Sequence, residues 1–465
     1  MTSVDHPLAH LARSSVPAWL VGGALRDRLL GRATSDYDVV VAGDPERVAH
    51  ALGSAAGGFA FALSEGFGSW RVVAHSRSWQ VDLLALTGGE IEADLGKRDL
   101  TVNALAEPLG GGGLVDPFGG LEDLRAARLR MVSPRAFDQD PLRVLRVARL
   151  GCELEFAVDP ATAAVARASA PRLAAVAPER VFIELRRIIA SPRALDGLEL
   201  MAGVGATEAV LPELNALRGV QQSHFHHLDV YEHTIAVLGQ TIELERTPES
   251  YFGADGEAVR ELLAAPLANE LSRGGALRFG ALLHDVAKPA TRRVSGGGRV
   301  TFLGHDELGA ELASSILGRL RAGERLREHV AALTRHHLRL GFLVHEQPLT
   351  RHAIYRYLSA CAPVQVDVTL LSVADRLATR GARSDEAIAS HLKLARALLS
   401  EALSWLADPP RPPIRGDELA RALRIVPGPE MGRLLHALEE ASFAGEIKTA
   451  EQAIERARQL LAGAG

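Results

Sequence analysis

Cysteine is scarce in this chain. Only Cys152 and Cys361 occur among the 465 residues, far apart in sequence and each among apolar neighbours. A disulfide framework or a structural zinc site requires several closely spaced cysteines, so both are excluded. We expect two reduced, buried thiols without a chemical role.

The sequence also lacks long apolar runs. No stretch approaches the ~20 consecutive apolar residues of a membrane-spanning helix, and the N-terminus carries no basic segment followed by an apolar one, as an export signal would. Hydrophobic residues make up 47% of the chain and charged residues 23%, which is typical of globular proteins. At ~150 residues per domain, we expect about three domains in a soluble, cytoplasmic protein that contacts no membrane.

A net basic charge is missing as well, because 52 basic residues face 57 acidic ones and the net charge is -5. Between residues 125 and 193, however, thirteen arginines and no lysine face seven acidic residues. Guanidinium groups bind phosphate through paired hydrogen bonds, so this segment could hold a nucleotide or RNA. A solvated helical face explains the same pattern equally well.

Two periodicities divide the chain. Short β-rich runs alternate with Gly, Asp and Ser clusters at first, and the expected strands lie within residues 16–23, 36–43, 69–75 and 78–86. Beyond residue 138, apolar residues recur three and four apart, which indicates helices. We expect an α+β fold with a mixed α/β domain at 1–135 and helical domains at 136–215, 216–404 and 405–465.

Residues 21–41 combine a glycine pair with two carboxylates. A strand turns at Gly22 and Gly23, a helix follows, and the next strand carries Asp36 and Asp38. Strand residues two apart point to the same face, so the carboxylates can bind a pair of divalent cations, while the glycines let backbone amides approach a phosphate. Asp82, on a later expected strand, is a candidate third carboxylate. In isolation, such a pair is more often a turn feature than a metal site.

Histidines and aspartates recur in the second half of the chain. His233, the adjacent His284 and Asp285, and Asp375 follow one another in helix-like sequence. Mixed imidazole and carboxylate ligands suit a divalent transition metal or Mg²⁺ in the core of a helix bundle. A lone histidine is more often structural, but the ordered set favours a metal site.

Five ordered segments carry a family resemblance: GGALRDRLLGR…DYD (22–38), KRDLTVNALA (97–106), DPFGGLEDLRAARLR (116–130), DQDPLRVLRVARL (138–150) and ERVFIELRRI (179–188). Together they closely resemble the class II CCA-adding tRNA nucleotidyltransferase and poly(A) polymerase family, within the DNA polymerase β superfamily. The resemblance implies a polymerase-β-like nucleotidyltransferase head with a small mixed sheet, followed by all-helical neck, body and tail domains.

The resemblance also assigns residues to the reaction. Asp36 and Asp38 would bind two Mg²⁺ ions, with Asp82 as a further catalytic carboxylate. The residues assigned to the nucleotide are Gly22, Gly23 and Arg26 at the triphosphate, Arg98, Asp99 and Asn103 at the ribose and phosphates, and Gln139, Asp140, Arg143 and Arg146 in the segment that reads the base. Asp99 and Asn103, four apart, share a face if their segment is helical.

Base recognition in this family uses a helix with an acidic pair followed by an arginine. Here Asp140 and Arg143, three apart on the expected helix, would present an acceptor beside a donor fork and so replace a Watson–Crick partner for cytosine or adenine. Outside such a motif, this pair is usually only a surface ion pair. The first acidic position is Gln139 instead of the commoner Glu, which weakens its orientation of Arg143.

A second departure is the short segment between Asp82 and Arg98, LLALTGGEIEADLGK. Full CCA-adding members carry a longer flexible loop here, which helps the pocket change from cytosine to adenine. By resemblance, short-loop members are CC-adding enzymes that require a separate A-adding enzyme. We therefore place CC addition ahead of CCA addition.

Residues 222–380 resemble the HD phosphohydrolase superfamily. The resemblance assigns a divalent metal (Mn, Ni, Mg or Fe) to His233, His284, Asp285 and Asp375, and a possible second metal to His305, His336 and His337. A metal lowers the pKa of its bound water and produces a nucleophile near neutral pH, which suits cleavage of phosphomonoesters or cyclic phosphates. RNA ends with a 2′,3′-cyclic phosphate are the target that we expect.

The leading hypothesis is a template-independent transferase that adds CMP, with or without a final AMP, to the 3′ end of tRNA from CTP and ATP. The tRNA would be held mainly through its phosphates and shape. One alternative is a poly(A) polymerase with the same head motifs. Another is a metal-dependent RNA or nucleotide phosphohydrolase whose head only binds.

Overall fold

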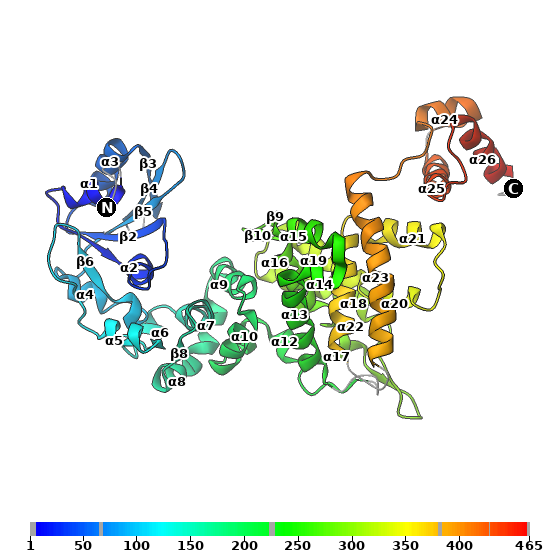
Figure 1. Ribbon diagram of the computed structural model, residues 1–465. Helices are drawn as coiled ribbons and strands as arrows, with labels where there is room; N and C mark the ends of the chain where they lie inside the picture. Colours follow the sequence, from blue (N-terminus) through cyan, green and yellow to red (C-terminus); the bar gives the residue numbers. More distant parts are fainter. Residues whose placement is uncertain (1–5, 65–67, 223–227, 380–383, 427, 463–465) are drawn as a thin grey trace. The chain divides into compact units, whose positions relative to one another are not determined.

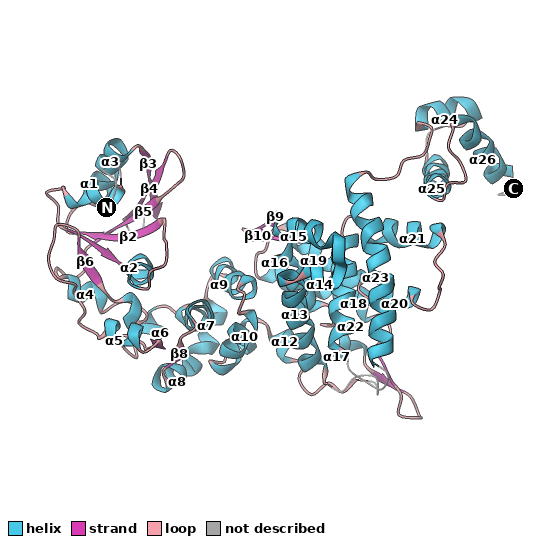
Figure 2. Cartoon of the chain, in the orientation of Figure 1, coloured by secondary structure: helices cyan, strands magenta, loops and turns pink. Residues whose placement is uncertain are grey.

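The computed structural model describes residues 6–64, 68–222, 228–379, 384–426 and 428–462. It divides into two compact units, Met1–Val210 and Leu211–Gly465. Figure 1 labels their elements in chain order, and Figure 2 shows that the larger sheet lies in the N-terminal part and that helices make up most of the remaining chain. The finer boundaries at residues 135 and 404 stay predictions.

The first unit contains a six-stranded mixed sheet. Its strands are β1 (Ala18–Val21), β2 (Asp36–Val41), β3 (Gly58–Ser64), β4 (Ser69–Ala74), β5 (Gln80–Ala85) and β6 (Ala106–Pro108). The strand order is β3-β4-β5-β2-β1-β6, and all neighbours are antiparallel except β2 and β5. The small mixed sheet and the four expected strands are confirmed, while β3 and β6 were not expected.

Helix α3 (Pro45–Ala56) covers one face of this sheet. It begins at the N-cap Asp44, whose side chain accepts from the Glu46 amide, and ends at Gly57 in the left-handed region. Alternate strand residues such as Val39 and Val72 are fully buried on this face. The other members of the head are α1 (Pro7–Ala12), α2 (Gly22–Leu29), α4 (Ile91–Leu95), the 3₁₀ helix Thr101–Asn103 and α5 (Gly120–Arg125).

The remaining part of the first unit is helical. Its elements are α6 (Ala136–Gln139), α7 (Arg143–Leu154), α8 (Pro160–Ser169), the 3₁₀ helix Ala170–Ala175, α9 (Pro178–Ala190), α10 (Ala194–Gly203) and α11 (Ala206–Val210). Helices α7 and α9 pack together through apolar residues at helical spacing, such as Leu145 and Leu185. A short parallel pair, β7 (Arg128–Leu129) and β8 (Ala157–Val158), joins this bundle to the head.

The second unit is built around a helix bundle. Its helices are α12 (Pro212–Asn215), α13 (Val230–Arg246), α14 (Pro248–Phe252), α15 (Gly256–Ala264), α16 (Arg273–Leu283), α17 (Lys288–Thr291), α18 (His305–Arg319), α19 (Glu324–His336), α20 (Arg339–Leu343), α21 (Arg351–Cys361), α22 (Gln365–Ala378) and α23 (Ser384–Ala407). A 3₁₀ helix spans Gly253–Asp255, and two hairpins consist of Pro266–Ala268 with Leu271–Ser272 and Arg293–Val294 with Val300–Thr301. Helix α13 packs against α16 and α22, and its N-terminus has a capping box formed by Asp229 and Glu232.

A small helical group follows the proline-rich run at 409–413. It comprises α24 (Gly416–Leu423), α25 (Pro429–Phe443) and α26 (Ala450–Ala462), packed around Leu419, Leu438 and Ala453. Helix α25 contacts α21, where the Tyr355 hydroxyl donates to Glu439 at 2.9 Å. Within the described residues, no single helix is long and apolar enough to cross a membrane; α21 and α22 reach that length only as a pair bent by 98°.

Candidate nucleotide and metal sites

Three carboxylates lie on one face of the head sheet. Asp36 and Asp38 are two apart on β2, and Asp38 is the register partner of Asp82 on the parallel strand β5. Both oxygens of Asp82 accept hydrogen bonds from Arg71, at 2.6 and 2.7 Å. Asp36 and Asp38 therefore have carboxylate oxygens that fit a divalent cation, whereas Asp82 is already neutralised by a guanidinium.

Asp38 sits where negative charge is concentrated. Burial raises its pKa to about 6, Arg98 opposes this rise, and the neighbouring charges of Asp36 and Asp82 add to it. A carboxylate in such surroundings gains most from a bound cation, because the cation compensates both burial and repulsion. This arrangement fits the two-Mg²⁺ prediction without identifying the ion.

A cavity of about 210 Å³ opens beside Asp38. Its walls consist of Gly22, Gly23, Asp38, Asp94, Lys97, Arg98, Asp99, Asn103, Arg143 and Arg146. Gly22 adopts a φ of +68°, and a Cβ there would lie 2.9 Å from both Asp38 Oδ2 and Arg98 Nη1. The first glycine of the pair is thus required by conformation and by space, since a side chain would displace a carboxylate and a cation.

A chain of polar contacts supports the floor of this cavity. Arg26 Nη1 donates to Asn103 Oδ1 at 2.7 Å, and Asn103 Nδ2 donates to Asp99 Oδ1 at 3.0 Å. Arg146 completes the chain through an ion pair with Asp99. Arg26, expected at the triphosphate, is buried behind Asn103 and is not among the residues that line the cavity.

The base-reading residues do not share one helix, contrary to our expectation. Asp140 has an extended backbone (φ −147°, ψ 100°) between α6 and α7, and Arg143 is the first residue of α7. Pro141 explains the difference, because a proline disfavours the helical conformation of the residue before it. Asp140 Oδ2 accepts a hydrogen bond from Arg180 at 2.7 Å. Arg180 belongs to the fifth family motif, residues 179–188, and no role was assigned to it from the sequence.

Arg143 is held by main-chain oxygens. Its guanidinium donates to Lys97 O at 2.6 Å, to Ala136 O at 3.0 Å and weakly to Gln139 Oε1 at 3.4 Å. Gln139 therefore lies beside Arg143 as expected, although the carbonyl groups provide the shorter contacts. Lys97 and Asp94 also line this cavity. They were not identified as site residues from the sequence, although Lys97 directly precedes Arg98 in the second motif.

The segment between Asp82 and Arg98 is ordered. It completes β5 at Ala85 and forms α4, whose Ile91 and Leu95 are buried in an apolar cluster with Val40. Because this segment is anchored in the core, it provides no long loop beside the cavity.

A second cluster of ligands lies inside the helix bundle. Two groups have ligand atoms within 4.8 Å of one another: His233, His284 and Asp375, and Asp285, His305 and His337. The six residues come from five segments. His233 lies on α13, His284 and Asp285 directly follow α16, His305 begins α18, His337 directly follows α19, and Asp375 lies in the last turn of α22. His336 belongs to neither group and accepts from Arg339 Nε at 2.9 Å, so only one member of the His336–His337 pair faces the cluster.

The imidazole rings of this cluster are oriented for metal binding. His284, His305 and His337 each place Nδ1 within 2.8 Å of a main-chain oxygen three residues earlier, so each Nε2 is directed inward. The Nε2 atoms of His305 and His337 are 3.3 Å apart. Two imidazole nitrogens at this distance can both coordinate one cation, so these residues fit a metal.

Buried polar atoms in the cluster point to the same conclusion. His284 Nε2 and Asp285 Oδ1 are buried without a hydrogen-bond partner, whereas Asp285 Oδ2 lies 2.6 Å from Lys288 Nζ. Burial lowers the pKa of His337 to about 4, so this ring is neutral and can act as a ligand at pH 7. Burial opposes ionisation of Asp285, but His284 and Lys288 hold its pKa well below the usual range.

A cavity of about 710 Å³ gives access to this cluster. Its lining includes two cations and two aromatic rings: Lys288, Arg376, Phe302 and Phe342. Lys288 Nζ is 2.6 Å from Asp285 Oδ2 and was not singled out from the sequence, although it lies one helical turn after the His-Asp pair. Arg376, together with metal ligands in the same cavity, suits a phosphorylated ligand.

Three family models match the chain. The chain matches the Poly A polymerase head domain over residues 18–130, the probable RNA and SrmB-binding site of polymerase A over 155–217, and the HD domain over 230–380. The first match contains Asp36, Asp38 and Asp82, and the third contains every ligand of the buried cluster.

Several relatives are similar over nearly the whole chain, two of them at 37–38% identity. An A-adding tRNA nucleotidyltransferase of Deinococcus radiodurans is 38% identical, covering 94% of each chain. A CC-adding tRNA nucleotidyltransferase of Thermus thermophilus is 37% identical, covering 94% of this chain and 92% of its own. The two relatives are thus about equally similar and differ in the nucleotide that their names specify.

Solved structures show the same fold. A CCA-adding enzyme without ligand aligns with a TM-score of 0.66 at 19% identity, covering 98% of this chain and 93% of its own. A Thermotoga maritima CCA-adding enzyme complexed with tRNA aligns with a TM-score of 0.60, also at 19% identity, covering 96% and 92%. The motifs, the two sites and the full-length relatives together show that this chain belongs to the tRNA nucleotidyltransferase family, with an HD domain after its nucleotidyltransferase head.

Proposed function

We propose that the chain transfers nucleotides from a ribonucleoside triphosphate to the 3′ end of tRNA, and that it is specific for a single base, cytosine. The transfer rests on one observation above all: Asp38 forms a wall of a cavity that also presents Gly22 and Arg98. This cavity brings together a metal ligand, a backbone able to approach a phosphate and a cation.

Two Mg²⁺ ions held by Asp36 and Asp38 would neutralise the triphosphate and activate the attacking 3′-hydroxyl. Arg98 lies on the side of Asp38 where the β- and γ-phosphates would rest and stabilises the leaving pyrophosphate. Asn103, fixed by Arg26 and Asp99, provides a positioned amide for the ribose or phosphate. Positioning and neutralisation of charge are sufficient for this reaction, which needs no protein nucleophile.

Specificity for one base follows from how Arg143 is held. Its contacts with Lys97 O and Ala136 O fix the guanidinium, and α4 anchors the segment that would otherwise be a flexible loop. A pocket that reads cytosine and then adenine must change shape, whereas these contacts favour one shape. Two relatives that are 37–38% identical are named A-adding and CC-adding, which supports single-base specificity and makes adenosine addition the second candidate.

The deciding experiment is product sequencing. A tRNA that ends at its discriminator base, and one that ends in CC, are each incubated with CTP, ATP or both. Addition of two cytidines to the first tRNA and nothing to the second supports the proposal and implies a separate A-adding enzyme as a partner. A single adenosine on the second tRNA supports the A-adding alternative, and long adenosine tails support a poly(A) polymerase.

Variants of the carboxylates test the site itself. Asp38→Asn should reduce transfer by at least ~1000-fold, because it removes a metal ligand from a reaction that depends on charge neutralisation. Asp82→Asn should reduce transfer less, because Arg71 already occupies both oxygens of Asp82. Equal losses of transfer activity in the two variants would indicate that Asp82 binds the metal as directly as Asp38.

We also propose that the buried His/Asp cluster is a metal-dependent phosphohydrolase site for RNA ends, including 2′,3′-cyclic phosphates. The unpaired atoms His284 Nε2 and Asp285 Oδ1 support a metal, and Arg376 in the lining of the cavity supports an anionic substrate. A bound metal would supply an activated water. One water should open a 2′,3′-cyclic end of tRNA to a phosphomonoester, and a second water should release that phosphate. Both steps should require Mn²⁺, Ni²⁺, Mg²⁺ or Fe²⁺ and should be absent in Asp285→Asn, while Asp38→Asn retains them.

The arginine-rich helical part of the first unit is proposed to bind the tRNA backbone. Phosphate contacts release counterions, so the affinity should fall steeply with salt. As a protein that acts on tRNA, it is expected to work in the cytoplasm.

A further inference from the structure

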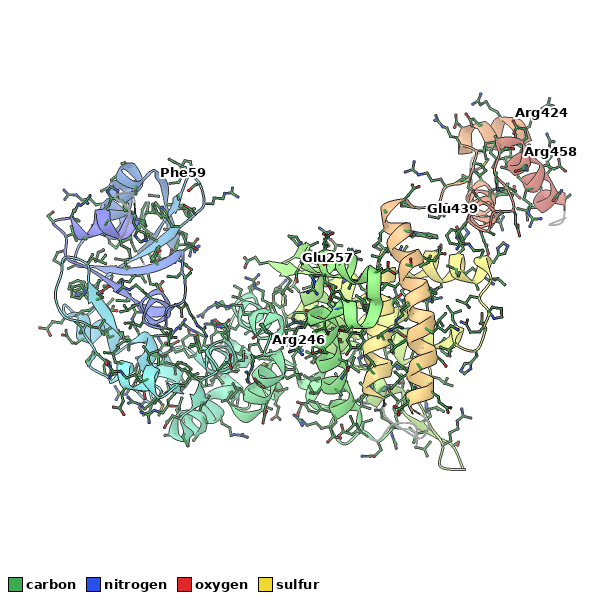
Figure 3. The ribbon with its side chains drawn as sticks, in the orientation of Figure 1. Phe59, Arg246, Glu257, Arg424, Glu439 and Arg458 are labelled. Atoms are coloured by element: carbon green, nitrogen blue, oxygen red, sulfur yellow. The ribbon has the colours of Figure 1, made fainter. Side chains whose placement is uncertain are left out.

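The outer strand β3 carries two exposed phenylalanines. Phe59 is 64% exposed and Phe61 46% exposed, and as residues two apart on a strand they face the same side. Figure 3 labels Phe59 on this strand, where its ring meets the edge of His75 at a centroid distance of 4.2 Å. Two large apolar side chains exposed side by side mark an interaction surface.

The sheet register places this surface on the same face as the reacting groups. Phe61 is opposite Arg71 on β4, Arg71 is opposite Asp82 on β5, and Asp82 is the partner of Asp38 on β2. Residues opposite each other on neighbouring strands share a face. At ~4.8 Å between strands, three strand steps separate Phe61 from Asp38 by ~14 Å.

The two halves of this face differ. Over β1 and β2, Val21 and Val40 are buried under Ile91 and Leu95 of α4. Over β5 and β3, the same face exposes Leu84, at 38%, and the two phenylalanines. The uncovered half therefore begins at the carboxylates and extends to the outer strand.

The direction of the reaction indicates what occupies the uncovered half. The cavity beside Gly22 and Arg98, where the leaving pyrophosphate would rest, lies on the β1 side of Asp38. In phosphoryl transfer the attacking and leaving oxygens are roughly in line, so the attacking hydroxyl approaches from the opposite side. That side is the half with β5, β4 and β3.

We propose that Phe59 and Phe61 are a stacking platform for the unpaired bases at the 3′ end of the RNA that is being extended. This inference rests on the proposed nucleotide transfer. Every base has a π face that stacks on an aromatic ring, and ~14 Å corresponds to about four stacked bases at 3.4 Å each. Arg71 lies between the platform and Asp38, but its guanidinium is paired with Asp82, so stacking provides the recognition here.

Leucine and tryptophan variants separate stacking from apolar contact. Phe59→Leu/Phe61→Leu keeps apolar surface without aromatic rings and should raise the Kd and KM for tRNA ~5-fold or more, while the KM for CTP or ATP stays the same. Phe59→Trp/Phe61→Trp should retain the wild-type KM for tRNA, and its fluorescence should be quenched when RNA binds. Val294→Ala, an apolar truncation at an exposed position of the second unit, is the matched control and should behave as wild type.

A tRNA with abasic residues at its unpaired 3′ positions completes a double-mutant cycle. Wild-type protein should lose affinity for the abasic RNA, and the leucine variant should show little further loss, because both changes remove the same stacking. Unchanged tRNA binding by the leucine variant, or additive losses, would overturn the platform even though transfer continues. A change of oligomeric state in the leucine variant would likewise overturn it and identify the surface as a protein interface. Absence of transfer by the wild type would instead refute the proposed function.

Discussion

Asp99 and Arg146 form an ion pair, with Asp99 Oδ2 3.0 Å from Arg146 Nη2, that joins the second motif of the head to helix α7. Asp99 is only 5% exposed. Burial alone would raise its pKa, but the charge of Arg146 and hydrogen bonds from Asn103 and the Leu100 amide lower the pKa to about 2. This carboxylate is therefore ionised at neutral pH.

Replacement of Asp99 by Asn tests this connection. The change keeps the shape of the side chain but leaves Arg146 without its counter-charge, and we expect a loss of about 2 kcal/mol in the free energy of unfolding, measured with urea. Asp138→Asn is the control, because its pair with Arg172 is exposed and should contribute little.

The contribution of Asp99 to the free energy of unfolding should fall as the pH is lowered. The pKa of Asp99 is lower in the folded protein than in the unfolded chain, so its contribution is present above pH ~4 and is lost as the pH falls toward 2. The difference in stability between wild type and Asp99→Asn should shrink over that window. A constant difference down to pH 2 would contradict this explanation.

The glycine pair should respond unequally to alanine. At Gly22, a Cβ would lie 2.9 Å from Asp38 Oδ2 at a positive φ, whereas at Gly23 the nearest atom is Arg26 Nη2 at 3.6 Å. Gly22→Ala should lower kcat/KM for the nucleotide by ~100-fold, because small displacements of reacting groups are costly. Gly23→Ala should cost clearly less, and steady-state kinetics at varied CTP and ATP will show whether the two losses differ.

Metal content distinguishes two neighbouring histidines. His337 contributes Nε2 to the buried cluster, while His336 binds Arg339 at the surface. His337→Ala should lower the metal content of the purified protein and its phosphohydrolase activity, and His336→Ala should change neither. Elemental analysis after dialysis against Mn²⁺ or Ni²⁺ measures this. Loss of metal from both variants would place His336 in the site as well.

The contact between α21 and α25 should weaken as the pH rises. His352 lies between Glu440, at 3.0 Å from Nδ1, and Glu446, at 2.8 Å from Nε2. Hydrogen bonds to Glu446 and Glu440 raise its pKa, while Arg356 lies 3.9 Å from Glu440. A raised folded-state pKa means that the contribution is complete below pH ~6.5 and disappears as the pH passes the higher, folded-state value.

Thermal unfolding at pH 6 and pH 9 tests this contact. The wild type should lose more stability between these pH values than His352→Gln, whose side chain does not titrate. Tyr355→Phe, which removes the neighbouring bond to Glu439 but no titrating imidazole, is the control and should keep the pH dependence of the wild type. Equal pH dependence in wild type and His352→Gln would exclude His352 as its cause.

Local periodicity in the sequence was sufficient for the strands that carry Asp36, Asp38 and Asp82, and for helices α7 and α9. Alternation of period two and apolar spacing of three and four are properties of neighbouring residues, so they can be recognised without tertiary structure. Strand β3 was not predicted because its sequence, GFAFALS, has no β-branched residue, although Phe59 and Phe61 alternate with alanines as in a strand.

The sequence by itself determined which side chains could bind metal and phosphate, because ligand chemistry belongs to the residue type. Only the tertiary structure decided that Arg26 supports Asn103, that Asp140 meets Arg180, and that His337 rather than His336 faces the cluster. Each of these depends on contacts between distant segments, or on the angle at which a helix presents two adjacent side chains. Packing, which no local pattern encodes, selects among residues of the same kind.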